Sequence, residues 1–209
     1  MKDRSEHPKP YNPLDKRNLG EDVAKKLLAA PLNPLPPTKR FMGAGVYAIY
    51  YNGEFALYKK ISAAGRRESD RPIYIGKADP SGGRKGGFEV DAPPGPELFN
   101  RLGDHAKSIG EASNLRPDDF RCRYLVVEDI WIRLAERILI EKYRPVWNVV
   151  VEGFGIHQPG KGRHGQKLSE WDVLHPGRSW TQHHKTLGHT AAEVSKKVEE
   201  FLSRKGGKP

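Results

Sequence analysis

One acidic residue of this sequence falls where an apolar one is expected. Glu136 shares a helical face with Ile132 and Ile140, whereas most charged residues around it follow another face. A carboxylate on an apolar face must be paired, protonated or bound to a cation, because burying it uncompensated costs several kcal/mol. Two interpretations stay open on this pattern alone: a structural salt bridge with a neighbouring arginine, and a metal ligand.

A basic pair four residues apart indicates a second kind of chemistry. Arg101 and His105 lie side by side on one face of a predicted helix, next to an apolar stripe that includes Leu102. Like charges at this spacing mildly destabilise a helix, so the pair suits a site where a phosphate group lies between the two side chains. A solvated basic face without a role in chemistry is the alternative.

Two tyrosines in predicted strands each have a glycine two residues away. Gly45 precedes Tyr47, and Gly76 follows Tyr74. A glycine at such a position lets another backbone or a phosphate approach the strand closely. Strand tyrosines are, however, usually ordinary core or surface residues, so this observation alone decides nothing.

The elements that must position these side chains alternate between strand and helix patterns. Period-two runs of aromatic and β-branched residues predict strands at 45–51, 71–77 and 120–127, and the chain turns extended again at 147–151. The polar segment between the first two strands predicts a hairpin with an insertion. Helices are predicted from Pro96 to Ile109 and from Trp131 to Tyr143. We therefore expect an α+β fold with a small antiparallel three-stranded sheet flanked by helices.

The segments on either side are expected to be extensions of this core, because 209 residues fit one domain. Residues 1–44 are expected to form a proline-bearing arm and a short helix over 21–30, with Asn18 as its N-cap. The core is expected to span residues 45–152. Residues 153–209 predict a long basic loop, without a clear element as far as His184, and a C-terminal helix from Ala191 to Arg204. Its capping box consists of Thr190 and Glu193.

The composition of the chain indicates which kind of partner it binds and in which cellular compartment it is expected. The chain has 36 basic and 26 acidic residues, and its net charge of +10 makes nucleic acid the first partner to consider. Cys122 is the single cysteine and cannot form an internal disulfide. No apolar run reaches the roughly 18 residues of a membrane span, and no secretion signal opens the chain, so we expect a cytoplasmic protein.

Taken in order, these residues resemble a known family. The Gly-Val-Tyr triplet at 45–47 and the Tyr-Ile-Gly triplet at 74–76 resemble the two signatures of the GIY-YIG nuclease superfamily, with valine replacing isoleucine in the first. Four polar residues follow in the superfamily's order: Arg101, His105, Glu136 and Asn148. The resemblance covers residues 45–150, and the flanks resemble the stand-alone restriction endonucleases of the group that cuts CCGCGG.

The spacing of the two tyrosines departs from most of the superfamily. Tyr47 and Tyr74 are 27 positions apart, whereas the tight hairpin of most members separates them by roughly a dozen. An insertion of this kind is similar to the restriction-enzyme branch, where extra segments embrace DNA. It argues against the repair and homing branches, which attach separate DNA-binding domains.

The resemblance implies that the chain hydrolyses phosphodiester bonds of double-stranded DNA with a divalent cation, Mg²⁺ or another. Glu136 would bind the cation, which would contact a phosphate oxygen and stabilise the leaving group. Arg101 would hydrogen-bond the phosphate as negative charge builds up, because its guanidinium stays ionised.

The remaining site residues would handle the nucleophile and the cleft. Tyr47 would be the general base toward water, although a phenol with a pKa of about 10 suits this role poorly unless cations or a base lower that pKa. His105 is a base that could accept the phenolic proton. Tyr74 would position water or phosphate, and Asn148 would orient the cleft by hydrogen bonds. Lys77 either contacts the phosphate or is a solvated lysine at a strand end.

A basic, glycine-rich loop after the core is the candidate for reading DNA. Residues 157–166 include side chains that hydrogen-bond base edges or phosphates, namely Lys161, Arg163, His164 and Gln166. Arginine and lysine bind guanine in the major groove, so the loop suits a GC-rich target; an ordinary basic surface loop is the alternative. The resemblance implies a palindrome such as CCGCGG, a homodimer clasped in part by the N-terminal arm, and a companion DNA methyltransferase.

Three other functions fit parts of the sequence. Gly155, Gly160 and Lys161 have the spacing of a phosphate-binding loop, but Gly162 replaces the hydroxyl residue that would bind magnesium. A zinc site would have to use histidines without cysteine, at spacings of no standard finger: His157, His164, His175, His183, His184 and His189. The non-enzymatic alternative is a DNA-binding module that has the basic surface and no site-specific activity.

Overall fold

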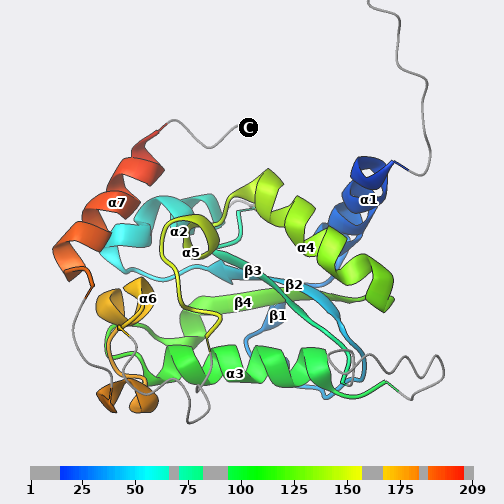
Figure 1. Ribbon diagram of the computed structural model, residues 1–209, viewed down its shortest axis with the longest axis horizontal. Coiled ribbons are helices and arrows are strands. Elements are labelled where there is room, and N and C mark those ends of the chain that lie inside the picture. The colour runs from blue at the N-terminus through cyan, green and yellow to red at the C-terminus, as the bar shows by residue number, and fades with distance from the viewer. Residues whose placement is uncertain (1–14, 66–70, 82–93, 157–166, 184–187, 205–209) are drawn as a thin grey trace, which may run out of the picture.

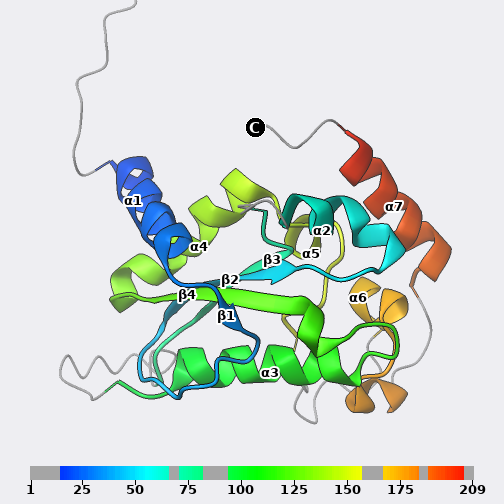
Figure 2. The same ribbon diagram turned by 180° about the vertical axis from the view of Figure 1, so that it is seen from behind.

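One antiparallel sheet of four strands forms the centre of the molecule. The computed structural model describes residues 15–65, 71–81, 94–156, 167–183 and 188–204. The strand order is β1-β4-β2-β3 (Figure 1), and the strands are β1 (Asn33–Pro34), β2 (Gly45–Tyr51), β3 (Tyr74–Ala78) and β4 (Phe120–Val126). The α+β class and the three longer strands are confirmed. The expectation of three strands was wrong by one, because the proline-rich tether adds the short β1 to the edge of β4, as Figure 2 shows.

Helices cover both faces of this sheet. Figure 1 shows α3 (Glu97–Glu111) below it, and α1 (Lys16–Ala29) and α4 (Asp129–Tyr143) above it. The central strand β2 is buried over its whole length, and its alternating side chains enter two separate cores. Val46, Ala48 and Tyr50 pack against α1 and α4, and the intervening residues pack on the side of α3. The two core helices predicted from the sequence are confirmed.

The first helix begins earlier than its sequence pattern indicates. Asp15, and not Asn18, is its N-cap, and the Asp15 carboxylate accepts a hydrogen bond from the backbone N–H of Arg17 at 2.9 Å. Gly20 lies inside the helix, where a Cβ atom would overlap Ile138 of α4. Glycine weakens a helix locally, but here it lets α1 approach α4 closely. The tertiary contact explains why the predicted start at residue 21 was wrong.

The extended stretch predicted at 147–151 is a short helix instead. Helix α5 (Val146–Val149) follows Pro145 and lies against the outer edge of β3. The backbone N–H of Trp147 donates to the carbonyl of Ile73 at 3.0 Å. This hydrogen bond satisfies a backbone carbonyl directly before β3, on the side where no further strand of the described residues pairs with it. The β-branched residues of this segment favour a strand locally. A helical turn forms instead, because it lets Trp147 pack into the core on the face of the sheet that α3 covers.

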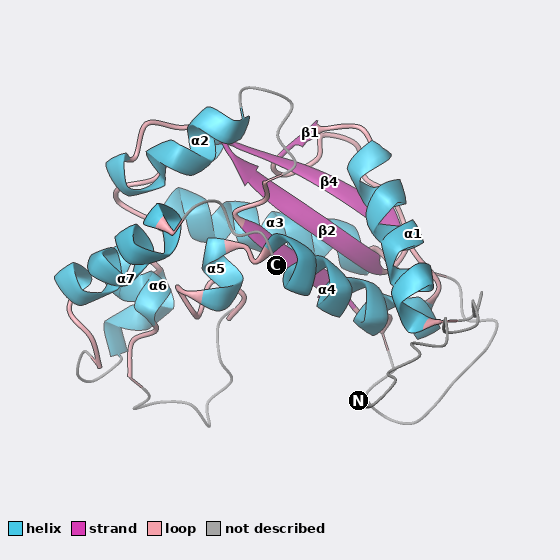
Figure 3. Ribbon diagram, turned by 90° about the horizontal axis from the view of Figure 1, so that it is seen from above, coloured by secondary structure: helices cyan, strands magenta, loops and turns pink. Residues whose placement is uncertain are grey.

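The remaining elements gather at one end of the sheet. The strand insertion contains η1 (Ala56–Tyr58) and α2 (Lys59–Gly65), and η3 (Pro117–Asp119) precedes β4. The segment without a predicted element contains α6 (Glu170–Leu174) and η5 (Ser179–His183), and α7 (Ala191–Ser203) follows with the expected capping box. Figure 3 shows α2, α6 and α7 together, at the opposite end from α1. Within the described ranges, no helix has the length and apolar character needed to cross a membrane.

Candidate active site

Two tyrosines of adjacent strands lie on the same face of the sheet. Tyr47 of β2 pairs with Gly76 of β3, and Tyr74 pairs with Ile49, so the tyrosines are diagonal neighbours. Their ring centroids are 6.2 Å apart. A Cβ atom at position 76 would overlap the Tyr47 hydroxyl. The glycine of the second triplet therefore makes room for the tyrosine of the first.

Helix α3 places its basic pair against these tyrosines. The Tyr47 hydroxyl lies 2.5 Å from Nε2 of His105, and both side chains are fully buried. The His105 ring also lies edge-on to Tyr74, with centroids 5.2 Å apart. When Nε2 is the unprotonated nitrogen, it accepts the Tyr47 hydrogen. The predicted helical face thus points into the site and is not a solvated basic face at His105.

Burial dominates the acidity of the Tyr47 hydroxyl. Desolvation raises its pKa well above the ordinary value, and the neighbouring Tyr74 raises it further. The charge and hydrogen bonding of Arg101 act in the opposite direction but do not reverse the shift. Nearby cations therefore do not turn Tyr47 into a phenolate in this state. A proton leaves this hydroxyl only if another base, His105, takes it.

One nitrogen of the Arg101 guanidinium is hydrogen-bonded, and another has an unused donor in the described part of the chain. Its Nη2 donates to the carbonyl of Gly155 at 2.9 Å. Its Nε is buried and finds no hydrogen-bond partner among the described residues. A guanidinium has five N–H donors and stays charged. The Gly155 carbonyl thus orients a guanidinium that still has an unused donor at Nε within the described ranges.

Glu136 approaches from the other side of the sheet. It lies on α4 beside Ala135, which is buried in the core that α4 shares with β2 and β3. Desolvation raises the pKa of the Glu136 carboxyl, and Asp79 adds to that rise, whereas Lys77 and Arg101 oppose it. Within the described ranges, no ion pair of the Glu136 carboxylate is found, and Lys77 pairs with Asp79 instead. The salt-bridge interpretation of Glu136 thus lacks a partner in the part of the chain that the structure describes.

Asn148 joins α5 to the edge strand. Its Oδ1 accepts a hydrogen bond from the Ile75 N–H at 2.8 Å, and its Nδ2 donates to the Ile75 carbonyl at 2.8 Å. Both ends of the amide are thereby used by the backbone of β3. Asn148 therefore holds the strand that carries Tyr74 and Lys77.

These residues meet around the open edge of β3. The tyrosines, Arg101 and His105 lie on the α3 side, and Glu136 and Lys77 lie on the α4 side. The two groups still act on each other electrostatically, since Glu136 raises the pKa of Tyr47 and of Tyr74. The expected DNA contacts Lys161, Arg163, His164 and Gln166 lie outside the described residues.

A family model described as the Eco29kI GIY-YIG domain matches residues 39–202, well over half of the chain. The chain belongs to the Eco29kI GIY-YIG family. This is a family of restriction endonucleases, so the chain is a GIY-YIG nuclease of the restriction type. A comparison with curated proteins found no match.

The Eco29kI GIY-YIG match extends beyond the resemblance seen in the sequence. It passes residue 150 and includes α6, η5 and most of α7. It also includes Gly153-Phe154-Gly155, a segment that the sequence placed in a basic loop without a catalytic role. Phe154 stacks on His105, with centroids 4.5 Å apart and rings inclined by 21°, and meets Tyr74 edge-on at 4.9 Å. An aromatic residue between two glycines was the signal that could have indicated this contact.

The zinc alternative finds no support in the described part of this family member. No group of three or more potential metal ligands among histidine, cysteine, aspartate and glutamate occurs there. His175, one of the zinc candidates, is buried between Tyr58 and Asn114, whose polar atoms lie 2.7 Å and 2.9 Å from its ring nitrogens. Burial lowers its pKa to about 3. The phosphate-loop candidates Gly160 and Lys161 lie outside the described ranges.

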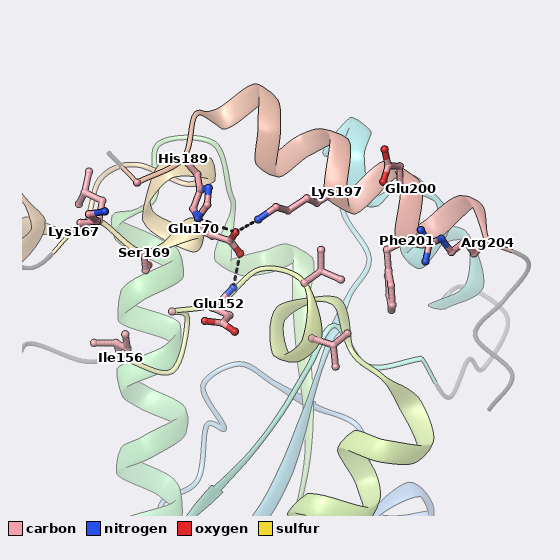
Figure 4. Close-up of a pocket in the computed structure, with 15 residues that line it drawn as sticks. Glu152, Ile156, Lys167, Ser169, Glu170, His189, Lys197, Glu200, Phe201 and Arg204 are labelled. Atoms are coloured by element: carbon pink, nitrogen blue, oxygen red, sulfur yellow. Dashed lines mark hydrogen bonds and ion pairs between the residues drawn. The ribbon is translucent and has the colours of Figure 1, made fainter. Parts of the chain in front are cut away.

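A wide groove lies beside the site but does not contain it. Its volume is about 850 Å³, and none of the six predicted catalytic residues lines it. Figure 4 shows Glu170 in this groove, bound to Lys197 at 2.5 Å and facing His189. The groove is therefore lined in part by side chains that already neutralise one another. Tyr47 and Glu136, whose pKa values burial raises, and Arg101, with its unused Nε donor, do not line this groove.

Proposed function

We propose that this chain is a type II restriction endonuclease that hydrolyses double-stranded DNA at a short GC-rich palindrome with the help of a divalent cation. The observation that carries the proposal is the placement of the buried Tyr47–His105 pair next to Arg101, whose Nε has no partner in the described residues. A proton acceptor beside a spare cationic donor is what phosphodiester hydrolysis requires.

Glu136 is the residue that would hold the cation. Mg²⁺ prefers oxygen ligands and is often bound through one or two carboxylates while it keeps several waters. The donor fits this ion, because Glu136 is a half-buried carboxylate, and Asp79 places further negative charge near it. When bound, the ion supplies positive charge to a phosphate oxygen and to the departing 3′ oxygen. Among the described residues, Glu136 is the one carboxylate to which we assign the cation.

Arg101 would receive the scissile phosphate. The Gly155 carbonyl holds Nη2, so the guanidinium has a defined direction before DNA arrives. A donor that is already oriented stabilises developing negative charge without further reorganisation. Lys77, paired with Asp79 at the end of β3, is a weaker candidate for a phosphate contact.

Proton transfer would run through the tyrosines to His105. Tyr47 is fully buried, and the half-buried Tyr74 lies beside it, with the two ring centroids 6.2 Å apart. The attacking water loses a proton to the Tyr74 hydroxyl while Tyr74 passes its own proton to the Tyr47 oxygen, and Tyr47 in turn passes its proton to Nε2 of His105. The raised pKa of Tyr47 favours this relay over a preformed phenolate. We thus assign Tyr47 to proton transfer and not to direct contact with the DNA backbone.

Recognition of DNA would depend on residues beyond this site. The net charge of +10 supports binding to a polyanion. The basic loop with Lys161, Arg163, His164 and Gln166 would contact bases or phosphates, and CCGCGG is the first target to test. A palindrome calls for a homodimer with one active site per strand, and a companion methyltransferase would protect the host DNA.

Plasmid cleavage tests this proposal directly. The purified protein is incubated with plasmids with and without a CCGCGG site, in Mg²⁺, in Ca²⁺ and with a chelator. Discrete fragments that require Mg²⁺ support a site-specific endonuclease, and sequencing their ends identifies the target. Smearing would indicate a nonspecific nuclease of the same fold. Intact DNA with a mobility shift would replace the proposal by a DNA-binding module without activity.

A further inference from the structure

The turn at residues 153–156 is held by a single buried arginine. Arg178 donates from Nη1 to the carbonyl of Ile156 at 2.7 Å and to that of Phe154 at 3.4 Å. Its Nη2 donates to the carbonyl of Gly153 at 3.1 Å. The arginine is only 1% exposed. Three carbonyls of one turn are therefore bound by one side chain from a segment more than twenty residues away.

The same arginine is fixed on its other side. The Asp172 carboxylate accepts from Nε at 2.6 Å and from Nη2 at 2.7 Å, and the Ser169 hydroxyl donates to Asp172 at 2.6 Å. Trp171 and Trp180 each lie 4.6 Å from the guanidinium carbon. These bonds use all five N–H donors of Arg178. Arg178 therefore has no donor left for DNA.

The opposite side of the turn contacts the candidate active site. The Gly155 carbonyl accepts the 2.9 Å hydrogen bond from Arg101. Phe154 stacks on His105, and a Cβ atom at position 155 would lie 2.6 Å from the Tyr74 hydroxyl. One turn therefore borders three of the residues to which we assign chemistry, and Arg178 holds the carbonyls on either side of Gly155.

We propose that Arg178 is a positioning residue: by fixing the turn at 153–156, whose Gly155 carbonyl binds Arg101, it aims Arg101 at the scissile phosphate. The stability of the fold alone does not explain why an arginine is buried at this position. A buried pair such as Arg178 with Asp172 contributes little more to the free energy of unfolding than well-packed apolar side chains would. A rigid second layer is, in contrast, what a precisely oriented donor needs. The inference rests on the proposed nuclease function of the same site.

The test compares Arg178→Lys with Leu27→Ala. Lysine keeps the charge but cannot bind Asp172 and three carbonyls together. Leu27 is buried in the core on the far side of the sheet, so its loss destabilises the fold without touching the turn. Single-turnover cleavage is measured at a temperature where circular dichroism shows both variants folded. Arg178→Lys is expected to cleave about 100-fold more slowly, the scale on which misplaced groups act, with unchanged DNA affinity in Ca²⁺. Leu27→Ala is expected to cleave at the wild-type rate.

Two further measurements separate positioning from a structural role. In the double variant with Arg101→Lys, the Arg178 change should add no further loss, because Arg178 acts through Arg101. The Ile156 N–H, which bonds to the Gly153 carbonyl at 3.1 Å, should exchange with solvent faster in Arg178→Lys and not in Leu27→Ala. Should Arg178→Lys fail to fold, Asp172→Asn loosens the same arginine and takes its place.

The outcomes also distinguish this proposal from the proposed function. A wild-type or faster rate in Arg178→Lys, or losses that multiply in the double variant, would overturn the positioning role while leaving the nuclease in place. If the wild-type protein cleaves no DNA, the nuclease proposal fails. The nuclear magnetic resonance signal of Arg101 Nε–H then still tests whether Arg178 orients Arg101 through the turn. The chemical shift of this signal is expected to change in Arg178→Lys and to stay unchanged in Leu27→Ala. An unchanged chemical shift in Arg178→Lys would show that Arg178 does not orient Arg101.

Discussion

The Tyr47 hydroxyl and Nε2 of His105 are 2.5 Å apart in a position that solvent does not reach. The two residues come from β2 and α3, so neither local segment contains the pair. Because burial raises the pKa of Tyr47, its proton is available only to a base in direct contact. The proposed relay depends on this contact. Five predictions follow from it and from other contacts of the structure.

Removing the Tyr47 hydroxyl should remove most of the activity and little of the fold. In Tyr47→Phe the ring still fills the core, but the relay to His105 is broken, so we expect cleavage to slow by about 10²–10⁴-fold. Single-turnover rates on a plasmid that contains the target measure the loss. Tyr50→Phe, on the opposite face of the same strand, is the matched control. Equal rates for the two variants would exclude Tyr47 from the relay.

Glu136→Gln should abolish cation-dependent cleavage and preserve DNA binding. The amide keeps the shape but loses the charge that holds the cation, at a cost of about a thousandfold in rate. Glu141→Gln, an exposed neighbour on the same helix, should behave as wild type. Mobility shifts in Ca²⁺ measure binding separately. Cleavage by Glu136→Gln at the wild-type rate in Mg²⁺ would disprove the assignment.

The raised pKa of Glu136 predicts a pH-dependent need for the cation. A carboxyl with a raised pKa takes up a proton at a higher pH than usual, and that proton competes with the cation. The Mg²⁺ concentration for half-maximal cleavage should therefore increase as the pH falls toward the range where Glu136 protonates. Titrations of Mg²⁺ at several pH values measure this dependence. A requirement that stays constant across them would contradict it.

His175 should make the protein less stable in acid. Its pKa is about 3 in the folded protein, against about 6.5 in an unfolded chain. Between these values the unfolded chain binds a proton that the folded protein does not, so stability is complete above about pH 6.5 and decreases as the pH falls. Between these two pKa values, the free energy of unfolding is expected to fall by about 1.4 kcal/mol for each unit by which the pH falls.

Urea unfolding of wild type and of His175→Gln at several pH values isolates this contribution. The variant should be less stable at neutral pH, because it loses the hydrogen bonds to Tyr58 and Asn114. It should also lack the slope that His175 adds. Parallel pH profiles of the two proteins would show that the buried histidine is not the acid-sensitive group.

Asn148→Ala should weaken the edge of β3. The substitution leaves the N–H and carbonyl of Ile75 without their side-chain partner, which costs about 1–3 kcal/mol of unfolding free energy. Because β3 carries Tyr74, activity should fall as well, even where the variant is folded. Asn52→Ala, an exposed position after β2, serves as the control. A variant as stable and as active as wild type would show that the amide clamp is dispensable.

Local patterns were sufficient for several parts of this protein. The alternation of residues 45–51 predicted a strand, and Thr190 with Glu193 predicted the start of α7, because period and capping are properties of neighbouring residues. The two tyrosine–glycine triplets likewise indicated the family, and the match over residues 39–202 bears this out.

Contacts between distant segments decided the rest. The sequence could not show that Gly20 fits against Ile138, that the segment after Pro145 docks on the edge of β3 as a helix, or that Arg178 binds the carbonyls at 153–156. Nor could it show that Glu136 and Tyr47 approach the edge of β3 from opposite faces of the sheet. Residue type and spacing determine which side chains share a strand or a helix face. Which faces meet is settled only when the whole chain packs, since burial and hydrogen-bond satisfaction are properties of the assembled core.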